Sequence, residues 1–221
     1  MDLITRIEQK MHVNGIAFFG TAYIRECLPK EFSHLPYSIT IGMRYPKTVI
    51  RQIDKAPTKE YFHQYRTMNA NLDRCGILAQ SMLLNEGFEA VYIPASQSDP
   101  KNEFSGALSH KIGAVKSGLG FVGKSNLFIH KDYGPAVRLL TVLTDMKLPE
   151  GKKTKADCGD CDKCFKACPA GAIHNVMPSD DYNRDDVLSP EKCSYFMKTK
   201  FQHIGRGSVC GICIRACPYS V

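Results

Sequence analysis

Eight of the ten cysteines fall in the last third of the chain, between Cys158 and Cys217. The first four follow the spacing C-x2-C-x2-C-x3-C before a proline, and the last three repeat the end of that pattern, again before a proline. Thiolates at such short spacings can converge on one inorganic core, so metal or redox chemistry is the first function indicated. The eight residues are Cys158, Cys161, Cys164, Cys168, Cys193, Cys210, Cys213 and Cys217.

The first run has the spacing that binds a four-iron cluster in bacterial ferredoxins, where the fourth cysteine ligates the neighbouring cluster. Cys193 is left to supply the member that the second run lacks. We therefore predict two 4Fe-4S clusters with crossed ligation. One cluster takes Cys158, Cys161, Cys164 and Cys217, and the other takes Cys168, Cys193, Cys210 and Cys213.

Other uses of these cysteines are open. Paired C-x2-C units also build four-thiolate zinc sites, although zinc ribbons do not need the x3-C-P ends that occur here twice. A disulfide framework is the weaker alternative. Clusters can merely hold a fold together, but two clusters joined to a separate domain favour a path for single electrons.

The residues before the cysteine-rich part alternate between helical and strand patterns. Apolar spacing predicts helices over residues 2–14, 58–85 and 106–117, and strands over 16–19, 37–43, 90–94, 127–130 and 137–144. Cys75 lies on the apolar stripe of the longest helix and is expected to be a buried small hydrophobe, whereas Cys27 could be reactive. Alternating helices and strands indicate a layered α/β (α+β) domain.

Composition changes near residue 150, where proline, glycine and lysines separate the two regimes. We predict an α/β domain over residues 1–150 that binds a corrinoid or a substrate, and a ferredoxin-like domain with two 4Fe-4S clusters over residues 151–221. Seventy residues with eight cysteines cannot bury much apolar core, so a covalent or metallic element must hold them together.

Charge and hydropathy restrict the partners and the compartment. The formal net charge is +7, and two oxidised clusters carrying about −2 each would reduce it to about +3. Such a mild excess does not indicate tight nucleic-acid binding, and the Lys152, Lys153 and Lys155 patch is expected to be a solvated linker. No apolar run is long enough to span a bilayer, and the N-terminus does not resemble a signal peptide. The expected location is cytoplasmic, without a membrane partner.

A glycine-rich segment, Gly118-Leu119-Gly120-Phe121-Val122-Gly123-Lys124-Ser125-Asn126, fits neither a Walker loop nor the dinucleotide fingerprint. Tyr133-Gly134-Pro135, Leu143-Thr144-Asp145 and the cysteine runs follow it. In this order, the motifs resemble those of the epoxyqueuosine reductases. The resemblance is strong over about residues 100–221 and weak before them.

That family reduces an epoxide on the wobble base of tRNA with cobalamin and two four-iron clusters, and it is related to the corrinoid reductive dehalogenases. The resemblance implies an α/β layer that holds the corrinoid against the clusters, and the family's crossed ligation agrees with the assignment above. It also implies that Gly120 lies against the macrocycle. The residues expected to border the cofactor are Gly118, Gly120, Gly123, Lys124, Ser125 and Asn126.

The sequence departs from the family in two places. The Asp-x-x-Pro stretch that supplies the family's proton donor is missing, so Glu103, His110 or Tyr133 would have to donate the proton. The competing interpretations are that Glu103 caps a helix, that His110 is solvated and that Tyr133 belongs to a turn. The chain also stops four residues after Cys217, without the family's C-terminal helical-repeat domain, which predicts a short relative.

Two functions are compatible with these observations. In the first, the protein is an enzyme that passes electrons through both clusters to a corrinoid and an organic substrate. In the second, it is an electron-delivery module that docks a partner such as a corrinoid protein. Either function needs an electron donor such as a ferredoxin or flavodoxin, and tRNA is not expected to be a tight partner. A flavin-dependent reductase is a weaker idea, because no flavin motif is present.

Overall fold

The computed structural model describes residues 1–97 and 104–220, and these residues form two compact units. The first unit comprises Met1–Arg44, Thr67–Leu119 and Arg138–Thr154, and the second comprises Tyr45–Arg66, Gly120–Val137 and Lys155–Val221. The units are therefore interleaved along the chain. The domain division predicted near residue 150 stays a prediction, although nearly all of residues 151–221 lie in the second unit.

A four-stranded sheet in the order β1-β2-β6-β3 forms the middle layer of the first unit. β1 pairs antiparallel with β2, and β3 pairs antiparallel with β6. The central strands are buried on both faces, as their apolar runs require. The strands are β1 (Phe18–Tyr23), β2 (Tyr37–Arg44), β3 (Ala90–Ile93) and β6 (Val137–Thr144).

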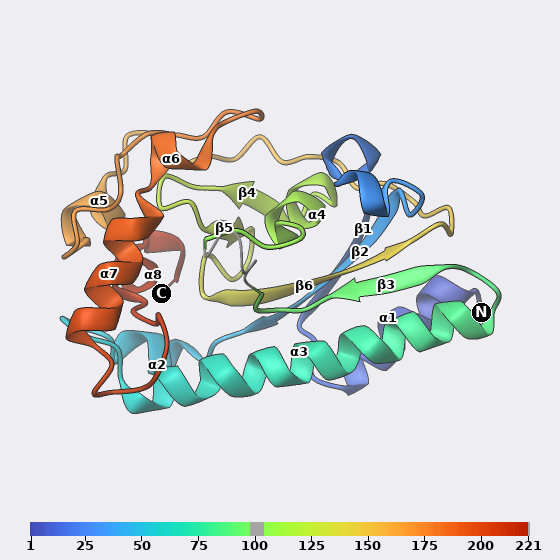
Figure 1. Cartoon of the computed structure of the whole chain (residues 1–221), viewed down its shortest axis with the longest axis horizontal. Helices are drawn as coiled ribbons and strands as arrows, with labels where there is room; N and C mark the ends of the chain where they lie inside the picture. Colours follow the sequence, from blue (N-terminus) through green and yellow to red (C-terminus); the bar gives the residue numbers. More distant parts are fainter. Residues whose placement is uncertain (98–103, 221) are drawn as a thin grey trace. The chain divides into compact units, whose positions relative to one another are not determined.

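Helices cover both faces of this sheet. Side chains alternate between the two faces along each strand, so the buried side chains of the central strands need a covering layer on each face. One face carries Ile39 and Ile41 of β2, which pack with apolar residues of α1 (Leu3–Val13) and α3 (Lys59–Asn85). The opposite face carries Ser38 and Thr40 of the same strand, next to α4 (His110–Lys116). Figure 1 shows α1 and α3 on one side of the sheet and α4 on the other.

The long helix α3 is specified by its caps and its apolar stripe. The Thr58 hydroxyl accepts a hydrogen bond from the Tyr61 N–H (3.1 Å), and Gly87 follows the helix with a φ of 87°. The apolar stripe predicted from the sequence is buried, except for Tyr65, which is half-buried. Its buried residues are Tyr61, Met68, Leu72, Cys75, Ala79 and Leu83. Cys75 is fully buried, as predicted, and Cys27 is exposed.

The second unit consists of short elements. A two-stranded hairpin pairs β4 with β5, and α5 packs against α8. None of its C-terminal helices exceeds 11 residues. The elements are α2 (Lys47–Arg51), β4 (Gly120–Val122), β5 (Phe128–His130), α5 (Lys163–Ala167), α6 (Arg184–Val187), α7 (Pro190–Lys200) and α8 (Ile212–Ala216). Three 3-10 turns complete the chain: Arg25–Cys27, Lys30–Phe32 and Pro218–Ser220.

The predicted fold class is confirmed, with shifts in several elements. The first strand begins at Phe18 and runs to Tyr23, beyond the predicted 16–19, because all six of its residues pair with Tyr37 to Gly42 of β2. The helix predicted over 106–117 begins only at His110. Among the described residues, no helix is long and apolar enough to cross a membrane.

Candidate metal centre

The eight clustered cysteines of the second unit fall into two electrostatic groups. Burial, together with the neighbouring thiols of the first run at Cys158, Cys164 and Cys161, raises the pKa of the Cys217 thiol to about 11. Burial also raises the pKa of Cys158 and of Cys164, and the neighbouring thiols among Cys158, Cys161 and Cys164 raise these values as well. Cys217 therefore lies with the first run, although 49 or more residues separate it from those cysteines in the chain.

The second group draws on three parts of the chain. Burial raises the pKa of Cys193 to about 11, and the thiols of Cys168 and Cys210 add to this effect. Burial raises the pKa of Cys210, and the thiol of Cys168 raises it as well. Burial also raises the pKa of Cys213, with smaller contributions from the thiols of Cys210, Cys193, Cys168 and, least of all, Cys164. This grouping agrees with the crossed ligation expected from the sequence. The ligation itself stays a prediction.

The first group surrounds a cavity. Its lining includes all four thiols of that group, together with Ser125, Ile129, Pro218 and Tyr219. Among the described residues, no three or more His, Cys, Asp or Glu side chains are arranged to hold a single metal ion. Four cysteines around one cavity are the donor set of a four-iron cluster, so the residues present fit this cofactor.

Two similar turns present the thiols of each run. Gly159, with a φ of 49°, follows Cys158, and Gly211, with a φ of 83°, follows Cys210. A short helix comes next in both runs, α5 or α8, and each ends in an extended cysteine, Cys168 or Cys217, before a proline.

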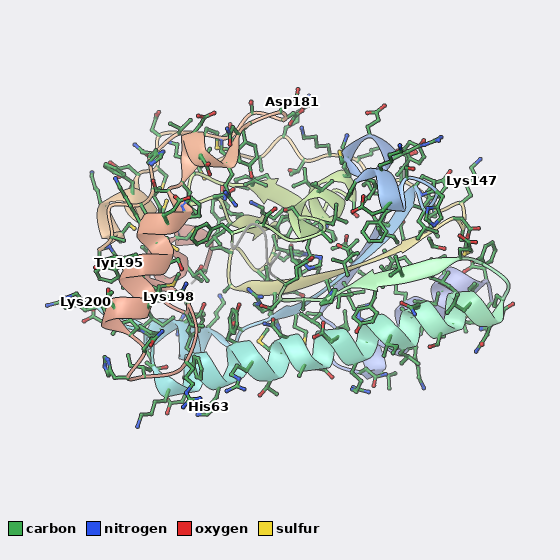
Figure 2. The ribbon with its side chains drawn as sticks, viewed as in Figure 1. His63, Lys147, Asp181, Tyr195, Lys198 and Lys200 are labelled. Atoms are coloured by element: carbon green, nitrogen blue, oxygen red, sulfur yellow. The ribbon has the colours of Figure 1, made fainter. Side chains whose placement is uncertain are left out.

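Cys193 is delivered by a helix rather than by a turn. α7 begins with Pro190 at its first position, and the chain before it is extended. Cys193 is half-buried, whereas Tyr195 is 73% exposed. Figure 2 shows Tyr195, Lys198 and Lys200 projecting from α7 into solvent. The proline could have signalled this helix, but its weak apolar periodicity hid it from sequence reasoning.

The structure shows a packing reason for the glycine at position 120. Gly120 belongs to β4, and a Cβ atom there would collide with the carbonyl oxygen of Ile129 in the paired strand β5. A Cβ on Gly118, whose φ is 74°, would likewise collide with the carbonyl oxygen of Lys152. Both glycines thus allow the chain to approach itself, and Gly120→Val would disrupt the hairpin rather than selectively block a macrocycle.

The end of the glycine-rich segment lies at the thiol cavity. Ser125 lines the cavity, and a Cβ on Gly123 would lie 3.0 Å from the Cys158 sulfur. Lys124, Ser125 and Asn126 are all more than nine-tenths buried. A corrinoid contact at these residues stays a prediction, and their contact with the thiol site is an additional feature that the sequence did not reveal.

The predicted proton donors lie in different surroundings. The Nε2 atom of His110 is 3.0 Å from the carbonyl oxygen of Pro94, and its Nδ1 atom is 3.0 Å from the hydroxyl of Thr141. Nε2 must therefore donate, and Nδ1 accepts from the hydroxyl. Both ring nitrogens of the half-buried His110 thus have protein partners, which does not fit a solvated side chain. Burial lowers its pKa to about 4. Glu103 lies outside the described residues.

Tyr133 lies in the second unit and His110 in the first. The Tyr133 ring stacks on His130, with ring centroids 4.7 Å apart and planes inclined by 20°. The backbone groups of His130 and Gly134 bond to each other across the same turn at 2.9 Å. These contacts fit a turn role for Tyr133, and its role as a proton donor stays a prediction.

His110 should make the folded state sensitive to acid. Its pKa is about 4 in the folded protein, below the ordinary 6.5, so the unfolded chain binds more protons between these values. Stability should therefore be present above pH 6.5 and decline as pH falls toward 4, by on the order of 2–3 kcal/mol from this group. Melting temperatures of wild type and His110→Gln, measured from pH 5 to 8, test this. An equally steep acid decline in both proteins would contradict it.

Crossed ligation predicts which cluster each cysteine variant damages. Cys168→Ser and Cys193→Ser should each impair one and the same cluster and leave the other, because both thiols belong to the second group. Electron spin resonance of the reduced variants, together with iron content, measures this. Cys27→Ala is the matched control and should keep full iron content. Unchanged iron and spin signal in Cys193→Ser would refute the assignment.

Comparison with known proteins supports the four-iron clusters over zinc. Residues 157–220 match the family described as a 4Fe-4S double cluster binding domain. The epoxyqueuosine reductase of Lactococcus garvieae (strain Lg2) is 31% identical over 127 residues, covering 52% of this chain and 33% of that protein. A tetrachloroethene reductive dehalogenase of Desulfitobacterium hafniense is 34% identical over 124 residues, covering 48% of this chain and 21% of that protein.

Solved structures show the same fold over nearly the whole chain. Epoxyqueuosine reductase from Streptococcus thermophilus superposes with a TM-score of 0.62 at 20% identity, covering 100% of this chain and 66% of that one. A reductive dehalogenase studied for B12-dependent dehalogenation gives a TM-score of 0.75 at 16% identity, covering 97% and 31%. The chain is thus similar to epoxyqueuosine reductases and reductive dehalogenases, of which it spans only part, and its residues 157–220 match a 4Fe-4S double cluster binding domain.

Proposed function

We propose that this protein is an iron-sulfur reductase that passes single electrons through two 4Fe-4S clusters to a corrinoid and an organic substrate, in the manner of an epoxyqueuosine reductase. The observation that carries the proposal is the sorting of eight buried or half-buried thiols into two groups that exchange their last cysteines. When bound, the corrinoid would supply a reducing or nucleophilic cobalt centre, which protein side chains cannot provide.

The two thiol groups are close enough for electron transfer between them. α5 and α8 pack against each other, and the thiol of Cys164 acts electrostatically on that of Cys213 in the other group. Two clusters held at such adjacent sites can exchange single electrons without a mobile carrier. An isolated cluster that only held the fold together would not need a second cluster beside it.

The protein would hold the corrinoid and move a proton. The candidates for corrinoid contact are Gly118, Gly120, Gly123, Lys124, Ser125 and Asn126, and the candidates for proton transfer are His110 and Tyr133. His110 is the weaker proton donor, because giving up its Nε2 proton would break the hydrogen bond to Pro94. Turnover that survives in His110→Gln and fails in Tyr133→Phe would favour Tyr133.

An electron-delivery module is the second candidate function. In this case the protein would dock a partner such as a corrinoid protein and reduce it, without a small substrate of its own. The absence of the Asp-x-x-Pro stretch and the occupied ring nitrogens of His110 favour this alternative. Both functions use the same two clusters, so they differ only in where the corrinoid is bound.

A ferredoxin or flavodoxin is the proposed electron donor, and the cytoplasm is the proposed location. The exposed Lys198 and Lys200 of α7, on the same helix as Cys193, give an acidic carrier a cationic surface close to one thiol group. Mixing with reduced ferredoxin should bleach the cluster absorbance if this donor is correct. A net charge near +3 can neutralise few phosphates, so we do not expect tight binding of tRNA.

A cobalamin titration separates the two functions. Cob(II)alamin is added anaerobically to the cluster-loaded protein, and the cobalt signal is followed by electron spin resonance. The enzyme function predicts stoichiometric binding with a changed axial-ligand signal. Because Gly120→Val would damage the β4-β5 hairpin, the appropriate control is the same titration with Cys27→Ala, which should bind like wild type. Absence of binding to cluster-loaded protein would exclude the enzyme function as stated and favour electron delivery.

A further inference from the structure

A turn formed by residues 123–126 lies directly against the Cys158 sulfur. Burial raises the pKa of the Cys158 thiol, and the backbone N–H of Lys124 acts in the opposite direction and lowers it. The absence of a side chain at Gly123 permits the approach, because a Cβ there would lie 3.0 Å from the same sulfur. The Asn126 N–H closes the turn on the carbonyl oxygen of Gly123 at 2.8 Å. A segment 34 residues before Cys158 in the chain therefore contacts one predicted cluster ligand.

The side chain of Lys124 brings a buried positive charge to this place. Lys124 is only 8% exposed, and burying an ammonium group is costly unless opposite charge accompanies it. Its electrostatic partners are Cys158 and Asp162. Asp162 already pairs with the exposed Lys166 at 2.6 Å. The thiolate and the cluster it holds are therefore the natural counter-charge for Lys124.

A second contact fixes the turn in its conformation. Asn126 has a φ of 57°, a left-handed conformation that is uncommon for residues other than glycine. The Tyr182 hydroxyl donates a hydrogen bond to the side-chain oxygen of Asn126 at 2.7 Å. Asn126 is buried and Tyr182 is half-buried. The Tyr182 contact therefore helps to hold the Lys124 N–H in its position against the sulfur.

We propose that Lys124, positioned by the turn of residues 123–126 and by Tyr182, raises the reduction potential of the cluster held by Cys158, Cys161, Cys164 and Cys217 relative to that of the other cluster. Reduction adds one negative charge to a cluster, and a buried ammonium and a backbone N–H near a ligand sulfur both stabilise the more negative state. The inference rests on the double-cluster domain and does not need a bound corrinoid.

This role differs from the corrinoid contact predicted for Lys124 from the sequence. A lysine that only touched a corrinoid would leave the cluster potential unchanged in protein without corrinoid. A lysine that compensates cluster charge acts whether or not a corrinoid is present. Potentials measured in the absence of corrinoid therefore distinguish the two roles, and they do so even if the proposed enzyme function fails.

The test compares wild type with Lys124→Met, which keeps much of the side-chain volume and removes the charge. Both proteins are loaded with iron and sulfide, and reductive titrations are followed by electron spin resonance without corrinoid. One of the two cluster potentials should fall, with its reduction equilibrium shifted about tenfold, or about 59 mV for a one-electron couple. The other potential should stay within experimental error of wild type.

Two further variants act as controls. Lys163→Met removes an exposed lysine directly before Cys164 and should shift the potential much less, because water screens its charge. Tyr182→Phe keeps every charge and removes the hydroxyl contact to Asn126, so it should lower the same potential by a smaller factor. If Lys124→Met does not assemble its clusters, the potentials of Tyr182→Phe test the proposal instead.

Three outcomes would overturn the proposal. The first is an unchanged potential in Lys124→Met with both clusters intact. The second is an equal shift in Lys163→Met, which would mean that burial of the charge is irrelevant. The third is failure of Lys124→Met to assemble its clusters together with wild-type potentials in Tyr182→Phe.

Discussion

The structure of the second unit depends on eight buried or half-buried thiols that gather in two groups, where metal binding requires the thiolate form. Burial and neighbouring thiols raise the pKa of Cys193 and Cys217 to about 11, so at neutral pH these residues would be thiols rather than thiolates. Iron reverses this preference, because the ligand is the thiolate and its bond to the metal compensates for the lost hydration. Cluster assembly and folding of this unit should therefore be coupled.

The exchange of the last cysteines between the two runs links this chemistry to the architecture. Cys168 and Cys217 each end a five-residue helix in extended conformation, and each joins the group of the other run. The predicted crossed ligation means that neither run completes a site alone, and it requires the segment from Cys158 to Cys217 to close on itself. Short helices suffice here because the clusters, rather than a large apolar core, hold the segment together.

The sequence specified the local features of this fold better than its long-range contacts. The stripe from Tyr61 to Leu83 and the caps at Thr58 and Gly87 are local signals, and α3 forms where they predicted it. The membership of Cys193 in the second group was expected because no other clustered cysteine was left to complete it. The α7 helix that carries Cys193 was missed because its exposed polar residues obscure any apolar periodicity.

The features that the sequence could not predict depend on contacts between residues that are far apart in the chain. The glycine-rich segment was interpreted as a ligand contact, but the space beside Gly120 is filled by the carbonyl group of Ile129. The approach of Lys124 to Cys158 depends on the three-dimensional fold, and no spacing rule connects these two residues. The hydrogen bonds of His110 could not be predicted either, because its partners, Pro94 and Thr141, are 16 and 31 residues away in the chain.

Quantification of iron, acid-labile sulfide and zinc in anaerobically purified protein tests the central claim most directly. The account predicts brown protein with about eight irons and eight sulfides per chain, as two four-iron clusters require. About two zinc ions per chain without labile sulfide would contradict it, because the same cysteines would then serve as structural zinc ligands.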